Sequence, residues 1–308
     1  MAAGTPSTHQ KCPPAHRRPT DVIATIRRRQ KPSSMRKVLV VSKTILIAGT
    51  SSGLGEAAVF EYAQRGWNVV AAMRNVAAAN PRFAELKNTV VTNIDVTDRA
   101  SIDAALALTG EKFGQLDALL NVAGYGQVGA IEEVTPAQLR AEYETNVVGV
   151  LNVVQAVLPQ FRVRRGGHIL VVGSMSAHLS FPTMTVYASS KAAVRSLVEG
   201  LQMECEPLGV KITLVEPAGY MTKFFDNVKT AERIDAYDDT YAGMQTIFDN
   251  AHFGNIPKSM GAVADITGID QPPQHFAINT DGLTWVRDTQ AARLAEYDKW
   301  EHITKETD

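Results

Sequence analysis

The stretch Thr44–Gly55 reads T-I-L-I-A-G-T-S-S-G-L-G and places a glycine-rich turn directly after a run of apolar residues. Gly49, Gly53 and Gly55 let the backbone turn sharply and approach a ligand with no Cβ in the way. A helix that begins there presents free N–H groups and the positive end of its dipole to phosphates. The stretch therefore predicts a strand–turn–helix unit that holds a dinucleotide pyrophosphate. A tight turn without a ligand is the alternative.

From Val38 onward, apolar runs of strand length alternate with stretches of helical pattern. The predicted strands are Thr44–Ala48, Val69–Met73, Thr89–Ile94, Ala118–Val122, His168–Val172 and Val210–Val215, and the predicted helices include Gly55–Arg65, Ala100–Thr109, Pro136–Leu158 and Tyr187–Glu206. This alternation is typical of a parallel sheet covered on both faces, so we expect an α/β, doubly wound fold. After Thr222 the alternation weakens: residues 223–262 show no clear strand, and residues 281–303 predict a closing helix.

The composition is that of an ordinary globular protein. The chain has 308 residues, of which 45% are hydrophobic and 20% charged, so it is long enough to bury a large core. Its formal net charge of −1 gives no reason to expect nucleic-acid binding. Two cysteines, Cys12 and Cys205, cannot build a disulfide framework and favour a reducing, cytoplasmic location. No apolar run reaches the roughly 18 residues of a membrane-spanning helix.

The first 37 residues differ from the rest of the chain. They hold nine basic residues, one acid and five prolines, a net charge of +8, whereas residues 38–308 carry −9. This composition predicts a basic, disordered extension over residues 1–42, followed by one domain over residues 43–308. We interpret the extension as a solvated tail or as sequence upstream of an alternative start at Met35. An organelle transit segment and a nucleic-acid-binding arm are alternatives, and a secretory signal is excluded because an apolar core is missing.

The end of the second predicted strand bears on the choice of dinucleotide. An NAD site has an acid there for the ribose 2′-hydroxyl, whereas this strand ends in Met73-Arg74. A guanidinium can bind a 2′-phosphate, so Arg74 favours NADP(H) unless it is a solvated loop residue. Asp95 closes the third strand and either accepts from an adenine amino group or caps the helix that follows.

A tyrosine–lysine pair follows the fifth predicted strand. Tyr187 and Lys191 are four residues apart and share one helix face, although two surface residues would show the same spacing. A nearby cation favours the phenolate and lowers the pKa of a tyrosine, which suits proton transfer near neutral pH. Ser174 lies just after strand His168–Val172, at the sheet edge where ligands bind, and could donate to a developing oxyanion. Asn121 closes the fourth strand at the same edge.

Taken together and in this order, these motifs resemble the classical short-chain dehydrogenase/reductase family over roughly residues 43–280. The matching residues are Ala48–Gly55 for the glycine motif, Asn121–Gly124 for N-N-A-G, Asn146 for the helix asparagine, Ser174 for the serine, Tyr187 and Lys191 for Y-x3-K, and Pro217–Gly219 with Thr222 for the P-G motif. The resemblance implies a Rossmann domain that binds NAD(P)(H) and interconverts an alcohol and a carbonyl. It also implies a homodimer or homotetramer paired through the long helices Pro136–Leu158 and Tyr187–Glu206.

The same resemblance implies a role for each site residue. Tyr187 is the general acid in reduction, Lys191 lowers the pKa of Tyr187 and holds the nicotinamide ribose, and Ser174 orients the carbonyl oxygen. Asn146 holds a water in the proton relay behind Lys191. The implied cofactor contacts, besides Tyr187 and Lys191, are Gly49, Ser51, Ser52, Gly53, Leu54, Gly55, Arg74, Asp95, Val96, Asn121, Ala123, Gly124, Pro217, Gly219 and Thr222.

Two positions depart from the family pattern. Ala48 stands where the family has a threonine, and Val122 stands where it has a second asparagine. Neither change removes a proton-transferring group. Within the family, the chain is similar to bacterial ketoreductases and to 17β-hydroxysteroid-dehydrogenase-like enzymes through residues 72–75, residues 121–126 and the C-terminal helix.

Residues 220–262 form the predicted substrate segment. Large apolar side chains gather there and either form a lid over a hydrophobic ketone or bury one helix against the core: Tyr220, Phe224, Phe225, Tyr237, Tyr241, Met244, Phe248 and Phe253. His178 could reach the substrate, although a loop histidine with its own hydrogen bonds is the more ordinary interpretation. The histidines show no metal-ligand spacing, so we expect no metal. A G-x-S-x-G motif is also missing, which leaves hydrolase chemistry without support.

The sequence therefore predicts an NADP(H)-dependent oxidoreductase that acts on a hydrophobic ketone or secondary alcohol. An NAD(H)-preferring enzyme of the same fold and a non-catalytic dinucleotide sensor are the alternatives. The predicted partners are a small-molecule substrate and further copies of the chain, with neither nucleic acid nor a membrane span.

Overall fold

The computed structural model describes residues 42–308, and the basic extension lies almost entirely outside these residues. A parallel seven-stranded sheet forms the centre of the described part, in the order β3-β2-β1-β4-β6-β7-β9. Its strands are β1 (Thr44–Ala48), β2 (Asn68–Met73), β3 (Thr89–Asn93), β4 (Ala118–Asn121), β6 (His168–Val172), β7 (Lys211–Pro217) and β9 (His275–Ile278). Two short strands, β5 (Gln127–Val128) and β8 (Lys229–Thr230), pair separately. The α/β doubly wound expectation is confirmed.

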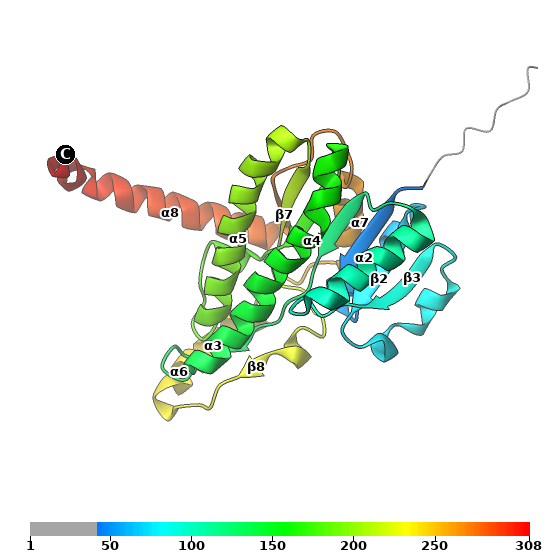
Figure 1. Cartoon of the computed structure of the whole chain (residues 1–308). Helices are drawn as coiled ribbons and strands as arrows, with labels where there is room; N and C mark the ends of the chain where they lie inside the picture. The colour runs from blue at the N-terminus through cyan, green and yellow to red at the C-terminus, as the bar shows by residue number, and fades with distance from the viewer. Residues whose placement is uncertain (1–41) are drawn as a thin grey trace, which may run out of the picture. The chain divides into compact units, whose positions relative to one another are not determined.

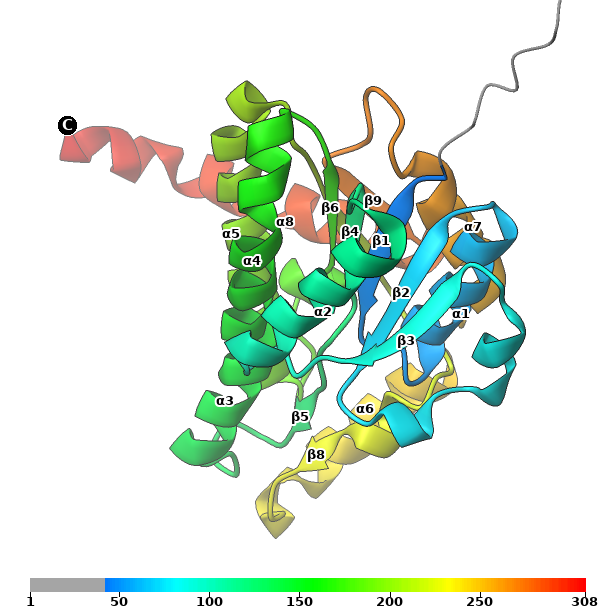
Figure 2. The same cartoon turned by 45° about the vertical axis from the view of Figure 1, so that its right-hand side comes forward.

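Helices cover both faces of the sheet (Figures 1 and 2). The helices are α1 (Gly53–Gln64), α2 (Arg99–Phe113), α3 (Pro136–Tyr143), α4 (Gly149–Arg164), α5 (Thr185–Cys205), α6 (Asp238–Asp249), α7 (Ile256–Ile266) and α8 (Thr280–Thr304). Helices α2, α4 and α5 pack on one face, and α1 and α7 pack on the other. The outer part of α8 extends beyond the sheet and is exposed (Figure 1).

The first strand shows why the sheet needs cover on both sides. Side chains alternate between the faces of a strand. Leu46 joins the cluster beneath α2, α4 and α5, whereas Ile45 and Ile47 join the cluster beneath α1 and α7. All three are fully buried, so a continuous apolar run is what this position in the fold requires.

Three elements differ from the sequence expectation. The helix expected over 136–158 is interrupted by a π-helical turn, Glu144–Val148, which separates α3 from α4. The segment 223–262, expected to lack a clear strand, contains the short β8 together with α6 and α7. Strand β9 lies outside every predicted strand and completes the sheet edge beside β7. Among the described residues, none of the helices is both long and apolar enough to cross a membrane.

Candidate active site

A cavity of about 620 Å³ opens at the carboxyl ends of the central strands, the edge where α/β sheets bind ligands. Most of the predicted site residues line it: Gly49, Ser51, Ser52, Gly53, Leu54, Arg74, Asp95, Val96, Ala123, Gly124, Ser174, Tyr187, Lys191, Pro217, Gly219 and Thr222. Gly55, Asn121 and Asn146 are buried and do not line it. The fold thus gathers segments that are far apart in the sequence at one opening.

The glycine-rich turn brings backbone so close to backbone that side chains do not fit. A Cβ on Gly49 would lie 2.7 Å from the nitrogen of Ala123, and a Cβ on Gly55 would lie 2.0 Å from the oxygen of Gly49. Gly49 and Gly53 also have φ values of 100° and 60°, in the region that favours glycine. The turn from Gly49 to Gly55 therefore exposes backbone rather than side chains at the start of α1, and we call it the glycine cradle.

The start of α1 retains free hydrogen-bonding groups that face the cavity. Ser52 is the N-cap residue, yet its hydroxyl makes no capping hydrogen bond. Backbone N–H groups in the first turn of a helix have no intrahelical acceptor, and the helix dipole favours an anion there. Cradle and helix terminus together fit the pyrophosphate of a dinucleotide.

Arg74 and Asp95 also line the cavity, shortly after the ends of β2 and β3. The Arg74 side chain is exposed and, within residues 42–308, makes no hydrogen bond or ion pair that would hold it in the protein. Asp95 accepts hydrogen bonds from the backbone nitrogen and hydroxyl of Thr97, at 2.9 and 2.7 Å. These bonds, together with the charge of Arg74, keep the pKa of Asp95 below its usual value. The N-cap of α2 is Asp98, so Asp95 is not the helix cap.

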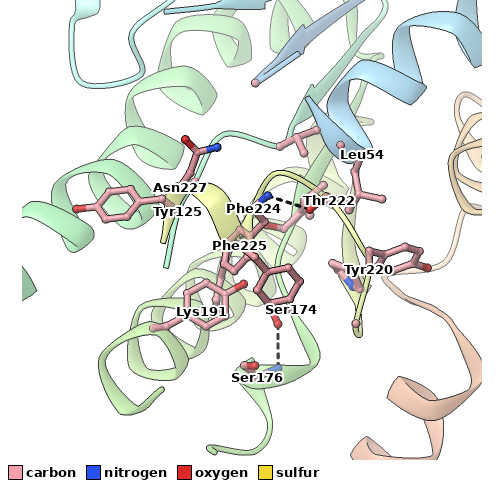
Figure 3. A pocket seen from close by; sticks show the side chains of 18 of the residues that line it. Leu54, Tyr125, Ser174, Ser176, Lys191, Tyr220, Thr222, Phe224, Phe225 and Asn227 are labelled. Carbon is pink, nitrogen blue, oxygen red and sulfur yellow. Dashed lines mark hydrogen bonds between the residues drawn. The ribbon is translucent and has the colours of Figure 1, made fainter. Parts of the chain in front are cut away.

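Ser174, Tyr187 and Lys191 lie close together on one wall of the cavity. Figure 3 shows Ser174 and Lys191 on this wall. The nitrogen of Ser176 donates to the Ser174 oxygen at 3.0 Å, which fixes that oxygen and leaves its O–H free to donate. The Lys191 ammonium donates to the carbonyl of Val172 at 3.1 Å and lies 5.8 Å from the centre of the Tyr187 ring. The predicted constellation is therefore assembled at the end of β6 and the start of α5.

The acidities of this group differ from the sequence expectation. Burial raises the pKa of Tyr187 to about 12, although a hydrogen bond with Ser174 acts in the opposite direction. Burial also lowers the pKa of Lys191 to about 8, against the charge of Glu142. The sequence predicts that Lys191 lowers the pKa of Tyr187, whereas in the structure desolvation is the largest influence on this pKa and raises it.

Asn146, Glu142 and Ser190 form a buried polar group, of which the sequence motifs indicate only Asn146. Asn146 occupies the π-helical turn, and its amide nitrogen donates to Glu142 and to Ser190, each at 3.1 Å. Glu142 has no exposed surface, and one of its carboxylate oxygens has no hydrogen-bond partner among the described residues. Burial raises its pKa to about 7, against a backbone hydrogen bond from Gln127 and the charge of Lys191.

Glu142 itself was missed by sequence reasoning. The usable signal was its spacing, because residues four apart share a helix face and Glu142 precedes Asn146 by four. Asn146 also exchanges two hydrogen bonds with the backbone of Tyr125, at 2.9 and 3.0 Å. Asn146 is therefore part of a hydrogen-bonded group with Glu142 and Ser190. This group acts on Lys191 through the charge of Glu142.

Part of the cavity lining is aromatic. Neighbouring rings form a chain from Tyr187 through Phe224, Phe225 and Phe248 to Phe253, with centroid separations of 4.8–5.7 Å. Of the expected lid residues, Tyr237 and Tyr241 do not line the cavity, because they hydrogen-bond to Glu132 and Glu133. Residues not singled out from the sequence complete the wall: Tyr125, Phe181, Met184 and Trp285.

His178 does not reach the cavity. Its ring hydrogen-bonds to buried Glu216 and contacts Gln290 of α8, as expected for a loop histidine with its own partners.

With this geometry in place, known proteins give a consistent comparison. The family model described as short chain dehydrogenase matches residues 43–233. The chain belongs to the short-chain dehydrogenase family. It is therefore an oxidoreductase that acts on CH–OH groups with a nicotinamide dinucleotide, as the sequence predicted.

Individual family members agree with this assignment. A 3-ketodihydrosphingosine reductase of Bacteroides thetaiotaomicron is 31% identical over 234 residues, which are 74% of this chain and 85% of the relative. A crystal structure of a short-chain dehydrogenase from Streptomyces avermitilis is 30% identical, with a TM-score of 0.81, and the match covers 87% of this chain and 98% of that one. A short-chain dehydrogenase/reductase from Burkholderia phymatum, solved with NAD, is 25% identical with a TM-score of 0.69, over 80% and 92% of the two chains.

Proposed function

We propose that this short-chain dehydrogenase interconverts a hydrophobic ketone and its secondary alcohol with NADP(H), using Tyr187 as the general acid and base. The observation that carries the proposal is the meeting of Ser174, Tyr187 and Lys191 on the wall of a cavity whose far side is the glycine cradle. A nicotinamide bound there supplies or accepts the hydride.

Each side chain has a distinct part in the proposed reduction. The Tyr187 phenol, whose raised pKa keeps it protonated at neutral pH, donates a proton to the substrate oxygen. Ser174 donates a hydrogen bond to the same oxygen as negative charge develops on it. Lys191, held on the Val172 carbonyl, stabilises the phenolate that remains. The polar group around Asn146 and Glu142 can return a proton toward Lys191.

The lining supports a hydrophobic substrate. Phe224 packs against Tyr187, and Phe225 and Phe248 continue the chain of rings from Phe224. Phe181 packs edge-on against Trp285 at 5.7 Å. Such a wall favours apolar groups, while the few polar groups orient the carbonyl. One relative is named for the reduction of a ketone, which agrees with this direction of reaction.

The preference for NADP(H) depends on Arg74. Its guanidinium lines the cavity, is exposed and lies beside Asp95, so it is available to a 2′-phosphate. The Burkholderia phymatum relative was solved with NAD, so family membership does not decide between the two dinucleotides.

Assembly through α4 and α5 and a cytoplasmic location stay predictions. In support of assembly, Val163 of α4 and Met203 of α5 expose 80% and 72% of their surface.

The test of the proposed function is Tyr187→Phe. We expect turnover of NADPH with apolar ketones to fall by at least about 10²-fold, because the proton donor is lost. Binding of NADPH, followed by nicotinamide fluorescence, should persist. Tyr297→Phe, a change at an exposed position on α8, is the matched control and should retain full turnover. Unchanged turnover in Tyr187→Phe would refute the role of Tyr187.

A further inference from the structure

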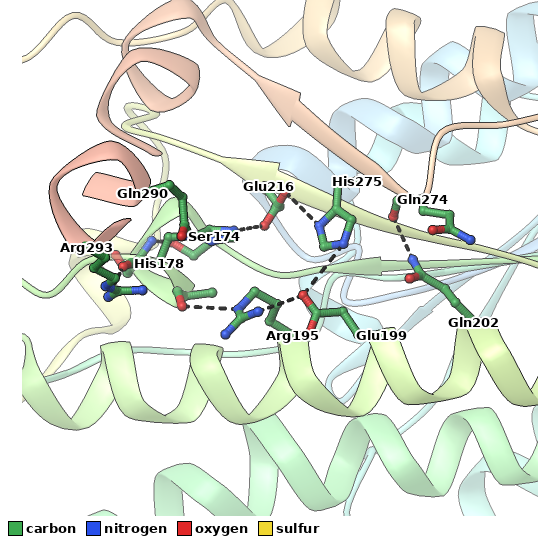
Figure 4. Close-up of polar contacts among 12 residues, drawn as sticks. Ser174, His178, Arg195, Glu199, Gln202, Glu216, Gln274, His275, Gln290 and Arg293 are labelled. Carbon is green, nitrogen blue, oxygen red and sulfur yellow. Dashed lines mark hydrogen bonds and ion pairs between the residues drawn. The ribbon is translucent and has the colours of Figure 1, made fainter. Parts of the chain in front are cut away.

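A buried carboxylate lies between two imidazoles outside the cavity (Figure 4). Glu216, on β7, hydrogen-bonds through Oε1 to His178 Nε2 and lies 3.4 Å through Oε2 from His275 Nδ1. One ligand atom from each residue lies within 4.8 Å of the others. His178 follows the turn that begins at Ser174, and His275 is the first residue of β9. Three separate elements thus direct metal-ligating atoms at one point.

Among the described residues, the possible ion-pair partners of Glu216 are both imidazoles. Glu216 is only 5% exposed, and among the described residues no lysine or arginine forms an ion pair with it. The two arginines labelled in Figure 4 have other partners: Arg195 pairs with Glu199 at 2.7 Å, and Arg293 donates to the backbone oxygen of His178. Buried carboxylates in proteins are paired with a cation or coordinate a metal.

Both histidines also have a partner on the side away from Glu216. The second ring nitrogen of His275 lies 3.7 Å from a Glu199 oxygen, and that of His178 lies 3.3 Å from the amide of Gln290. Metal-ligating histidines almost always donate their other ring N–H to an acceptor, which fixes the ring and its tautomer. Glu199 is the acceptor nearest to hand for His275, although a separation of 3.7 Å is longer than a hydrogen bond. The Gln290 amide can present its oxygen to His178 after a flip of the side chain.

We propose that His178, Glu216 and His275 form a zinc site. Two imidazoles and one carboxylate are a characteristic zinc donor set, whereas Mg²⁺ and Ca²⁺ prefer oxygen ligands. Ligands about 2.0–2.1 Å from a tetrahedral ion are about 3.4 Å apart. His275 Nδ1 and Glu216 Oε2 already have this separation of 3.4 Å. Small side-chain rotations at His178 complete the arrangement.

The site has a structural consequence. None of the three residues lines the cavity, so the zinc ion does not take part in the proposed reaction. Its ligands instead connect β9, which leads directly into α8, with β7 and with the loop that carries Ser174. Zinc that binds only the folded protein raises its stability by mass action. We therefore expect zinc to stabilise the packing of β9 and α8 against the loop that carries Ser174.

The experiment is a zinc titration of the full chain. The protein is freed of metal with a chelator, dialysed and titrated with ZnCl₂ by calorimetry, while the unfolding temperature is followed in parallel. Histidines outside the site are the same in wild type and His275→Gln, so the difference between these two proteins reports the site. His275→Gln is the main variant because its side chain is 38% exposed and its loss is tolerable for folding. His302→Gln, an exposed position near the end of α8, is the matched control.

We expect wild type and His302→Gln to bind one more equivalent of zinc than His275→Gln, and only these two to gain several degrees in unfolding temperature. Glu216→Gln should lose the same equivalent, and MgCl₂ should give no shift in any variant. Equal zinc stoichiometry and equal thermal shifts in wild type and His275→Gln would overturn the proposal, as would an equal shift with MgCl₂. Binding of NADPH by His275→Gln should be unchanged, so this test is independent of the proposed function.

Discussion

Glu142 holds a carboxyl group in the interior next to Lys191, Asn146 and Ser190. Its pKa of about 7 in the folded protein, against an ordinary value of 4.5, follows from burial. The folded state therefore holds a proton on Glu142 at pH values where the unfolded chain has lost it. Stability from this group is greatest below about pH 4.5 and decreases as pH rises toward 7.

Glu142→Gln removes this titration while keeping a side chain of the same shape. Between pH 5 and pH 7.5 we expect the variant to gain about 1–2 kcal/mol in free energy of unfolding relative to wild type. Urea unfolding at the two pH values measures the difference. Glu144→Gln, an exposed change two residues away, is the control and should show no pH-dependent gain. A difference between variant and wild type that is the same at both pH values would contradict the buried titration.

Arg74 is the residue on which the cofactor preference depends. Arg74→Ala should weaken NADPH binding by about 10- to 100-fold, because charge-assisted hydrogen bonds to a phosphate contribute about 1.5–3 kcal/mol. Binding of NADH should be almost unchanged. Arg99→Ala, in an exposed ion pair with Asp103 on α2, serves as the control. If NADPH affinity stays the same in Arg74→Ala, the guanidinium is only a solvated loop residue.

At the scale of elements, the β1–α1 turn depends on glycine geometry. Gly49→Ala places a Cβ 2.7 Å from the Ala123 nitrogen at a φ of 100°. We expect a loss of about 1–3 kcal/mol in stability and a marked loss of NADPH affinity. Gly110→Ala, inside α2 with open space around the new Cβ, should instead stabilise by about 0.5–1 kcal/mol. Thermal unfolding and NADPH titration of both variants check this contrast, and equal effects would contradict it.

Elements with a strong apolar run were predictable from sequence, and those defined by tertiary contacts were not. The strands Thr44–Ala48 and His168–Val172 are confirmed with the expected bounds because each is an unbroken buried run. Strand β9 begins with an exposed histidine and has only four residues, too few for a periodic signal. The π-helical turn at Asn146 depends on hydrogen bonds to Tyr125 and Ser190, which local sequence does not encode.

At the scale of the molecule, the residues of the candidate site come together at the carboxyl-terminal edge of the sheet. The residues of the glycine turn, Ser174, Tyr187 and Lys191 were predictable because each belongs to a spaced motif whose position at a strand end is known. The group around Glu216 was not, because Glu216 and His178 lie 38 residues apart and meet only after the sheet has formed. The spacing of Glu142 and Asn146 was visible in the sequence, but the contact of Glu142 with Ser190, 48 residues away, required the fold. The chemistry-bearing motifs were therefore visible in the sequence, whereas the charges that support them required the fold.

The central claim is that the cavity binds a nicotinamide dinucleotide for this chemistry. Titration of the full chain with NADPH and NADH at fixed salt, followed by nicotinamide fluorescence, tests it most directly. We expect saturable binding of one NADPH per chain, with NADH at least about 10-fold weaker because it lacks the phosphate that Arg74 binds. Tighter binding of NADH would contradict the role of Arg74, and binding of neither nucleotide would contradict the central claim.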